Sequence, residues 1–561
     1  MKKIKEERNI SHRHSFRKFP ALTCLLLCLL FFVPGCGGSR DDYWPTTDWK
    51  VSTPEEQGID SEKLIAMFQA IEKKGIEYHS ILIVRGGFLV LEAYFSPFKK
   101  NYKHINYSAT KSMSSLLIGM AVADGDIQNI QQPLLLDFFP AYKNQIENLD
   151  ERKKSLTLFH LLTMTDGLEW QDWPYRVGRE GDFLKLLGAE DGVKYYLNKP
   201  VRNVPGKTFN YNSGSSYMLA AIIQQTTGKS ALEYAREKLF TPIGISDACW
   251  GVFQDGINNG ASELYLKPRD MARIGYLLLK KGAWQGKQII PESWLRDSTK
   301  AYIKSDFAPY HYGYQWYIDK GSPVFNYSSQ GLGGQAIFVI PDRDMVVVFT
   351  GAIRREKDSP PFYFMDFLLP AAAASSPLPA NPEANRELAR ILREIENPRA
   401  QPVPDLPARA RDISGRTFFF DTKGGKKNLF GLETATLFFD HEGKCRIRFT
   451  YAEKMDYISM GFDALYRRNP GSKRMTELDI QVGLDGIYRA VTADSEIGPM
   501  PYFAKGAWKD NNTFFMNYKS GWCIRGRYTF TFDSSDNLSV TCSSIFYKFT
   551  LTGRMHNTPG K

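Results

Sequence analysis

The sequence predicts an α+β protein: an antiparallel sheet flanked by helices, with an α-helical subdomain, followed by a C-terminal all-β barrel or sandwich. Strand hairpins at residues 80–95 and 333–352 enclose a long region of helical periodicity, which favours an antiparallel sheet over a βαβ repeat. Short alternating strands dominate from residue 412 onward. The chain has 561 residues, too many for one typical core, so we expect at least two folded units.

Residues 1–35 predict a lipoprotein signal peptide. Seven basic residues precede the stretch ALTCLLLCLLFFV, whose 13 residues are short for a membrane span but suit a signal core. The stretch ends in VPGCGGS, which resembles a bacterial lipoprotein processing site with Cys36 as the lipidated residue. We therefore expect a lipid-anchored protein of the cell envelope, on the outer membrane or facing the periplasm in a Gram-negative cell. Plain secretion and an uncleaved anchor remain alternatives.

Charge and cysteine content exclude several other classes. The formal net charge is +11, but without the basic leader it falls to +6 and no dense basic run remains, so we expect no nucleic-acid partner. No Cys or His cluster has metal-ligand spacing, so we expect no metal and no other cofactor. A Cys523–Cys542 bridge is possible in an oxidising compartment, and the sequence leaves it open, as it does the oligomeric state.

Residues 44–370 predict the main domain. SILIVRGGFLVLEAYF reads as a hairpin joined at Arg85-Gly86-Gly87. Helical periodicity begins at Ser108 and recurs over residues 155–170, 215–245 and 269–282. The pattern over residues 215–245 is broken near Gly228, which predicts two helices there. A second hairpin follows, with Pro341-Asp342 in its turn.

The C-terminal third changes character twice. Residues 371–411 are rich in Ala and Pro around one short charged helix, which predicts a linker. Residues 412–561 predict the β-domain. In KCRIRFTY, for example, apolar and polar residues alternate as in a half-buried strand.

The segment YSATKSMSSLLIG contains the candidate catalytic residues. Ser108 and Lys111 lie three residues apart at the start of a helix, so both side chains should lie on nearly one face, with Lys111 close enough to take the serine proton. Free N–H groups at the helix N-terminus would stabilise negative charge there and favour a neutral lysine. The alternative is that Ser108 only caps the helix and Lys111 is solvated.

Two further segments favour the catalytic interpretation, although Tyr211 could be a core aromatic residue and the Gly-rich turn a simple β-bulge or hairpin. PGKTFNYNSG places Tyr211 just before a helix, and SSQGLGGQAIFVIP is a Gly-rich turn into a strand. In this order and spacing, the three segments resemble the serine β-lactamase-related family, which includes class C β-lactamases, D,D-peptidases, esterases and 6-aminohexanoate-dimer hydrolases. VSTPEEQGID, LTLFHLLTMTDGL and SELYLKPRDMARIGYLLLKKG extend the resemblance from about Trp49 to Gly351.

The resemblance implies a β-lactamase/D,D-peptidase-like fold and an acyl-enzyme mechanism. Ser108 would be the nucleophile, Lys111 its base partner and Tyr211 a proton relay. The backbone N–H groups of Ser108 and Leu332 would form the oxyanion hole. The third motif, on a strand at the sheet edge, falls on Ser329-Gln330-Gly331.

Two departures from the family pattern bear on the substrate. Ser213 stands where β-lactamases have the Asn of Tyr-x-Asn, and Ser329 stands where they have the Lys or His of the third motif. We expect both positions, with Gln330 and Gly331, to line the substrate site, but without the cation that attracts a β-lactam carboxylate. The sequence therefore favours a hydrolase of a small-molecule ester or amide. A D,D-peptidase or β-lactamase, and a catalytically silent peptidoglycan- or partner-binding protein, remain alternatives.

Overall fold

The computed structural model describes residues 43–172, 181–353, 359–420, 432–440, 444–451, 477–493, 500–520, 525–534, 537–544 and 548–555. The predicted signal peptide, Cys36 and Cys523 lie outside these residues, so lipidation and the Cys523–Cys542 bridge stay predictions. Within the described part of the chain, no helix combines the length and apolar character needed to cross a membrane.

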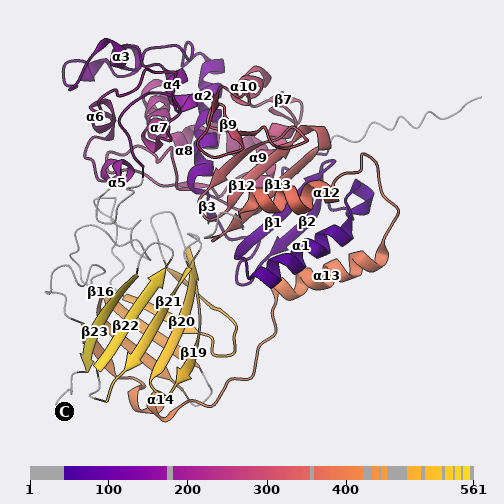
Figure 1. Cartoon of the computed structure of the whole chain (residues 1–561), viewed down its shortest axis with the longest axis vertical. Coiled ribbons are helices and arrows are strands. Elements are labelled where there is room, and N and C mark those ends of the chain that lie inside the picture. Colours follow the sequence, from indigo (N-terminus) through magenta and orange to yellow (C-terminus); the bar gives the residue numbers. More distant parts are fainter. Residues whose placement is uncertain are drawn as a thin grey trace, which may run out of the picture. The chain divides into compact units, whose positions relative to one another are not determined.

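The main domain is built on one eight-stranded antiparallel sheet (Figure 1). Its strand order is β2-β1-β13-β12-β11-β10-β9-β8. The strands are β1 (Tyr78–Arg85), β2 (Phe88–Tyr94), β8 (Ile303–Lys304), β9 (Tyr310–Tyr312), β10 (Tyr317–Asp319), β11 (Tyr327–Gly331), β12 (Gln335–Ile340) and β13 (Met345–Gly351). The first and last long strands of the domain, β1 and β13, are neighbours in the sheet, which confirms that the two predicted hairpins belong together.

Local sequence explains both hairpins. Gly86 and Gly87 adopt φ of 61° and 84° between β1 and β2, a left-handed conformation that glycine adopts without a steric cost. The other hairpin turns through Pro341–Arg343 and Asp344, whose φ is 44°. Residues of β12 and β13 are buried on both faces, because helices cover both sides of the sheet.

Each face of the sheet has its own core. On one face, α1 (Ser61–Lys74), α12 (Leu369–Ala371) and α13 (Pro382–Glu396) cover residues such as Phe338 and Phe349 (Figure 1). On the other face, α9 (Pro268–Leu279) and the helical subdomain cover Ile337 and Val348. The subdomain contains α2 (Thr110–Asp124), α3 (Glu151–Lys154), α4 (Leu158–Thr163), α5 (Asp182–Leu187), α6 (Gly192–Leu197), α7 (Ser213–Thr227) and α8 (Ala231–Ala235).

Part of the expected linker packs against the main domain. Helix α13 contacts α1 and β2, and its Leu388 is buried in the same core as Phe338. The charged residues that dominate its sequence lie on its exposed side, as in the Arg390 pairs with Glu387 and Glu394. The sequence shows the helix, but its apolar stripe is too short to identify where the helix docks.

The C-terminal region forms a ten-stranded antiparallel sheet that is nearly closed into a barrel. The order is β17-β16-β15-β14-β23-β22-β21-β20-β19-β18, and the ends approach each other through a bridge between Gly483 and Lys505. Its elements are α14 (Ala408–Ile413), β14 (Thr417–Phe420), β15 (Leu432–Phe439), β16 (Cys445–Tyr451), β17 (Glu477–Val482), β18 (Arg489–Ala493), β19 (Met500–Asp510), β20 (Thr513–Ser520), β21 (Arg525–Phe532), β22 (Asn537–Ser544) and β23 (Lys548–Met555). The predicted alternation in β16 is confirmed, since Cys445, Ile447 and Phe449 are buried. The fold class is therefore as predicted, and of the two predicted forms of the β-domain, barrel or sandwich, the sheet is close to a barrel.

Candidate active site

Ser108 lies in a single 3-10 turn, Tyr107–Ala109, that leads directly into α2. Tyr107, the residue before it, has φ of 44°. A bulky residue in this left-handed region costs about 1–3 kcal/mol, and such strain collects at functional sites. The turn therefore holds Ser108 at the N-terminal end of the helix, where the sequence predicts it.

Helix α2 is buried on all sides, not on one side as its sequence suggests. Every residue from Thr110 to Ala121 is buried. Two serines of the helix have internal partners: Ser112 Oγ donates to Gln315 O at 2.6 Å and Ser114 Oγ donates to Gly260 O at 2.8 Å. A helix fixed in this way holds its side chains rigidly, which a catalytic base requires.

Lys111 reaches Ser108 along the helix face. Its Nζ donates to Ser108 Oγ at 3.2 Å and to the carbonyl oxygen of Ala261 at 2.9 Å. Burial lowers the pKa of Lys111 to about 8, because the charged ammonium is poorly solvated, while Asp172 partly opposes this shift. A substantial share of Lys111 is therefore neutral near pH 8, as a base must be.

Tyr211 completes the group. It precedes α7, whose N-cap is Asn212, and its hydroxyl interacts with the side chains of Ser108 and Tyr317. Its ring lies below Lys111 Nζ, 4.9 Å from the centroid. Burial, followed by the neighbouring Tyr317, raises the pKa of Tyr211 well above its usual value. The phenol therefore stays protonated and can pass a proton without becoming a permanent anion.

The predicted third motif lies at a locally open sheet edge. Strand β10 pairs only with Tyr327 and Ser328 of β11, so Ser329–Gly331 pair with β12 alone. Ser329 is fully buried, and within the described residues its Oγ has no hydrogen-bond partner. Gln330 Nε2 donates to Ser328 Oγ at 2.9 Å. None of the three residues Ser329, Gln330 and Gly331 has a cationic side chain.

Gly331 brings this strand against the nucleophile turn. A Cβ at Gly331 would lie 2.2 Å from Asn106 O and 3.1 Å from Ala109 N, so only glycine permits the approach. Leu332 follows, and its side chain is 47% exposed. The oxyanion hole requires this proximity, because its two predicted N–H groups belong to Ser108 and Leu332.

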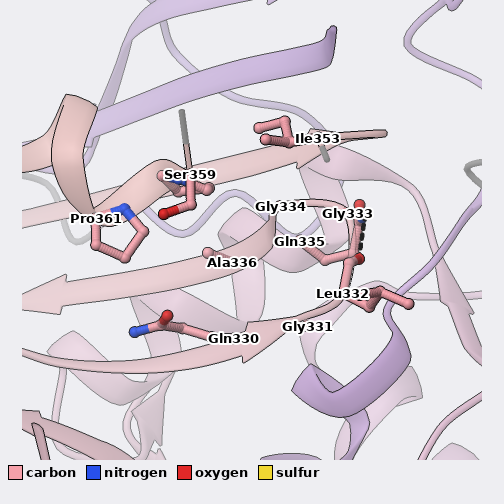
Figure 2. A pocket seen from close by; sticks show the side chains of 11 residues that line it. Gln330, Gly331, Leu332, Gly333, Gly334, Gln335, Ala336, Ile353, Ser359 and Pro361 are labelled. Carbon is pink, nitrogen blue, oxygen red and sulfur yellow. Dashed lines mark hydrogen bonds between the residues drawn. The ribbon is translucent and has the colours of Figure 1, made fainter. Parts of the chain in front are cut away.

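Gln335 fixes the turn that carries Leu332. Its Nε2 donates to Leu332 O at 3.0 Å and to Gly351 O at 2.8 Å, and Figure 2 shows the first of these bonds. The turn also borders a cavity of 220 Å³, seen in Figure 2, which Ile353 and Ser359–Pro361 close on the other side. The Gly-rich segment therefore has a defined shape before any substrate binds.

The family model for Beta-lactamase matches residues 64–359, which are more than half of the chain and include Ser108, Lys111, Tyr211 and the third motif. This chain belongs to the Beta-lactamase family. It is a serine hydrolase with the fold that its sequence predicts.

Among its relatives is the 6-aminohexanoate-dimer hydrolase of Paenarthrobacter ureafaciens, 22% identical over 330 residues that cover 53% of this chain and 79% of the relative. A putative 6-aminohexanoate-dimer hydrolase from Bacillus anthracis has a solved structure with a TM-score of 0.49 and 21% identity, covering 60% of this chain and 90% of that one. The penicillin-binding protein homologue from Pyrococcus abyssi gives a TM-score of 0.44 and 15% identity, covering 88% and 99%.

In this member of the Beta-lactamase family, two buried carboxylates hold the segment that follows Tyr211. Asp172 accepts hydrogen bonds from Ser213 N at 2.9 Å and Ser213 Oγ at 2.6 Å. Asp166 accepts from Asn212 Nδ2 at 3.0 Å. Ser213, which the sequence predicts to contact substrate, is buried, and its hydroxyl donates to Asp172.

The structure thus brings together Ser108, Lys111 and Tyr211, and it places Gly331 and Leu332 beside them. Sequence reasoning missed Asp172 because WQDW carries no motif and lies 39 residues before Tyr211. It also missed Phe307, which packs against the Tyr211 ring with centroids 5.6 Å apart. An aromatic residue in a loop gives no signal of such a contact before the fold is known.

Proposed function

We propose that this chain hydrolyses a small neutral ester or amide through an acyl-enzyme at Ser108. The observation that carries the proposal is that two side chains meet at the Ser108 hydroxyl: Lys111 Nζ lies 3.2 Å from Ser108 Oγ, and Tyr211 interacts with the Ser108 side chain. This is the arrangement of a nucleophile with a base and a relay.

Acylation follows from these positions. Neutral Lys111 takes the proton from Ser108 Oγ as that oxygen forms a bond to the substrate carbonyl carbon. The carbonyl oxygen becomes an oxyanion, which the N–H groups of Ser108 and Leu332 stabilise. The proton then passes through Tyr211 to the leaving oxygen or nitrogen as its bond to carbon breaks.

Deacylation uses the same groups in reverse. A water molecule loses its proton towards Tyr211 and Lys111 while its oxygen attacks the acyl carbon. A second oxyanion forms, and Ser108 Oγ leaves with a returning proton. The carboxylic acid is released, and Lys111 is neutral again for the next cycle.

The residues of the third motif support a neutral substrate. Ser329 is buried, and neither it nor Gln330 offers a positive charge to a substrate carboxylate. The relative from Paenarthrobacter ureafaciens is named 6-aminohexanoate-dimer hydrolase. We infer that amide or ester cleavage, and not β-lactam cleavage, is the activity of this chain.

A label on the nucleophile tests the proposal. A fluorophosphonate should modify the intact protein but not Ser108→Ala, and the wild type should hydrolyse p-nitrophenyl esters or short amides. Ser112→Ala is a matched control, because Ser112 lies on the same helix with its hydroxyl bonded to Gln315 O. Absence of labelling in the wild type would indicate a silent binding protein. Faster turnover of nitrocefin or D-Ala-D-Ala peptides than of every ester would indicate a β-lactamase or D,D-peptidase.

We also propose that Cys36 anchors the protein to the cell envelope through lipid. The VPGCGGS segment after an apolar core supports this, and the several acyl chains of a bacterial lipoprotein hold firmly where one chain would not. Cys36→Ser should lose metabolic lipid labelling and leave the membrane fraction. Mass spectrometry that finds a mature N-terminus elsewhere, without lipid, would refute the anchor.

A further inference from the structure

Phe307 is an exposed aromatic side chain beside the proposed proton relay. It lies in the loop between β8 and β9 and is 46% exposed. Its ring meets Tyr211 edge-on at 5.6 Å between centroids and Tyr317 edge-on at 6.1 Å. Half of a large apolar ring therefore remains open to solvent next to a catalytic side chain.

The Phe307 ring packs against a cluster of aromatic side chains. Tyr317 packs against Tyr312 at 5.1 Å between centroids, and Tyr312 packs against Phe209 at 5.2 Å. Tyr312 and Phe209 are buried together with Met164. The support beneath Phe307 is thus preorganised, so a ligand that covers the ring does not have to order it first.

The position of Phe307 indicates which part of a bound substrate it would contact. Tyr211 must reach the leaving atom to protonate it, so the leaving group occupies the space beside the Tyr211 hydroxyl. The acyl part extends from the carbonyl carbon, whose oxygen lies at the N–H groups of Ser108 and Leu332. Phe307 contacts Tyr211, and it therefore borders the leaving-group side of the site.

We propose that Phe307 is a specificity residue that binds an apolar alcohol or amine portion of the substrate. The inference rests on the proposed function and adds to it the class of leaving group. Covering the exposed ring removes apolar surface from water, and each methylene that does so should raise kcat/KM by about two- to fourfold. The alcohol or amine leaving group of this enzyme is thus apolar, such as a hydrocarbon chain, and not a sugar or a peptide with a charged end.

Two substrate series separate this role from simple structural support. The first varies the alcohol at constant acyl group, from methyl through butyl to hexyl butyrate. The second varies the acyl chain at a constant p-nitrophenol. Phe307→Ala should flatten the dependence of kcat/KM on alcohol length and leave the acyl dependence within about twofold. Phe325→Ala is the matched control, because Phe325 is 44% exposed but packs against Tyr327.

Deacylation supplies a second readout. Once the alcohol has left, Phe307 has nothing to bind, so the butyryl-enzyme should hydrolyse at the same rate in the wild type and in Phe307→Ala. An unchanged alcohol dependence in Phe307→Ala, or an equal loss in both series with slower deacylation, would overturn the assignment. Failure of the wild type to turn over any ester or amide would overturn the proposed function, and the leaving-group site with it.

Discussion

The pH dependence of acylation should report the ionisation of Lys111, and Asp172 should set its midpoint. Burial lowers the pKa of Lys111 to about 8, and the charge of Asp172 raises it within that environment. Since the neutral amine is the base in the proposed mechanism, kcat/KM should increase with pH through this value and then level off. Replacing Asp172 by Asn removes the negative charge, so the pKa of Lys111 should fall and the midpoint should move to lower pH.

The size of the effect follows from a pKa of about 8. A lysine with that pKa is about a tenth neutral at pH 7 and half neutral at pH 8, so the wild type should gain about fivefold in kcat/KM over this interval. In Asp172→Asn the gain over the same interval should be smaller. The amide keeps an oxygen for Ser213 N and can donate to Ser213 Oγ, so Tyr211 should keep its place.

The assay is hydrolysis of p-nitrophenyl butyrate at substrate concentrations well below KM, from pH 6 to pH 10. Asp182→Asn is the matched control, because Asp182 bonds to Tyr195 and Lys199 in the same subdomain. Its profile should keep the wild-type midpoint. A midpoint that does not move in Asp172→Asn, or that moves to higher pH, would refute the reasoning that Asp172 stabilises the charged lysine.

Other substitutions test the remaining parts of the site. Gly331→Ala should cost roughly a hundredfold in kcat/KM with little loss of thermal stability, because its Cβ would push β11 away from Asn106, and near-normal activity would contradict the close approach. Ser329→Lys should narrow the kcat/KM ratio of esters to nitrocefin by about ten- to a hundredfold, and an unchanged ratio would contradict the alignment of the third motif. Lys111→Ala and Tyr211→Phe should each cost roughly a hundredfold, and the double variant should lose far less than the product of the two if both act on one proton path.

The sequence was sufficient for the parts of the protein that local patterns determine. Glycines at 86 and 87 mark the first hairpin, and both have the positive φ that their turn needs. The spacing of Ser108 and Lys111 places both on one helix face, and their hydrogen bond of 3.2 Å follows directly. Such features depend on neighbours within a few residues, which a sequence displays.

The sequence did not predict contacts between segments that are far apart along the chain. Asp172 acts on Lys111 and holds Ser213, although 61 and 41 residues separate it from them along the chain. The burial of α2 on all sides depends on Gly260 and Gln315, which accept from its serines. Phe307 meets Tyr211 only because the β8–β9 loop folds over it. A long-range hydrogen bond leaves no periodic trace in either partner's local sequence.

The opposite pKa shifts at this site agree with the direction of proton flow in the proposed mechanism. The same low-dielectric surroundings that lower the pKa of Lys111 to about 8 raise that of Tyr211, since each group avoids its charged form. The neutral amine of Lys111 and the neutral phenol of Tyr211 therefore both lie beside Ser108 Oγ at the start of the catalytic cycle. Of these two, only the amine has a free lone pair basic enough to take the serine proton, so in the proposed mechanism Lys111 would accept it and Tyr211 would donate towards the leaving group. In the proposed mechanism, burial thus favours Lys111 as the base and Tyr211 as the acid.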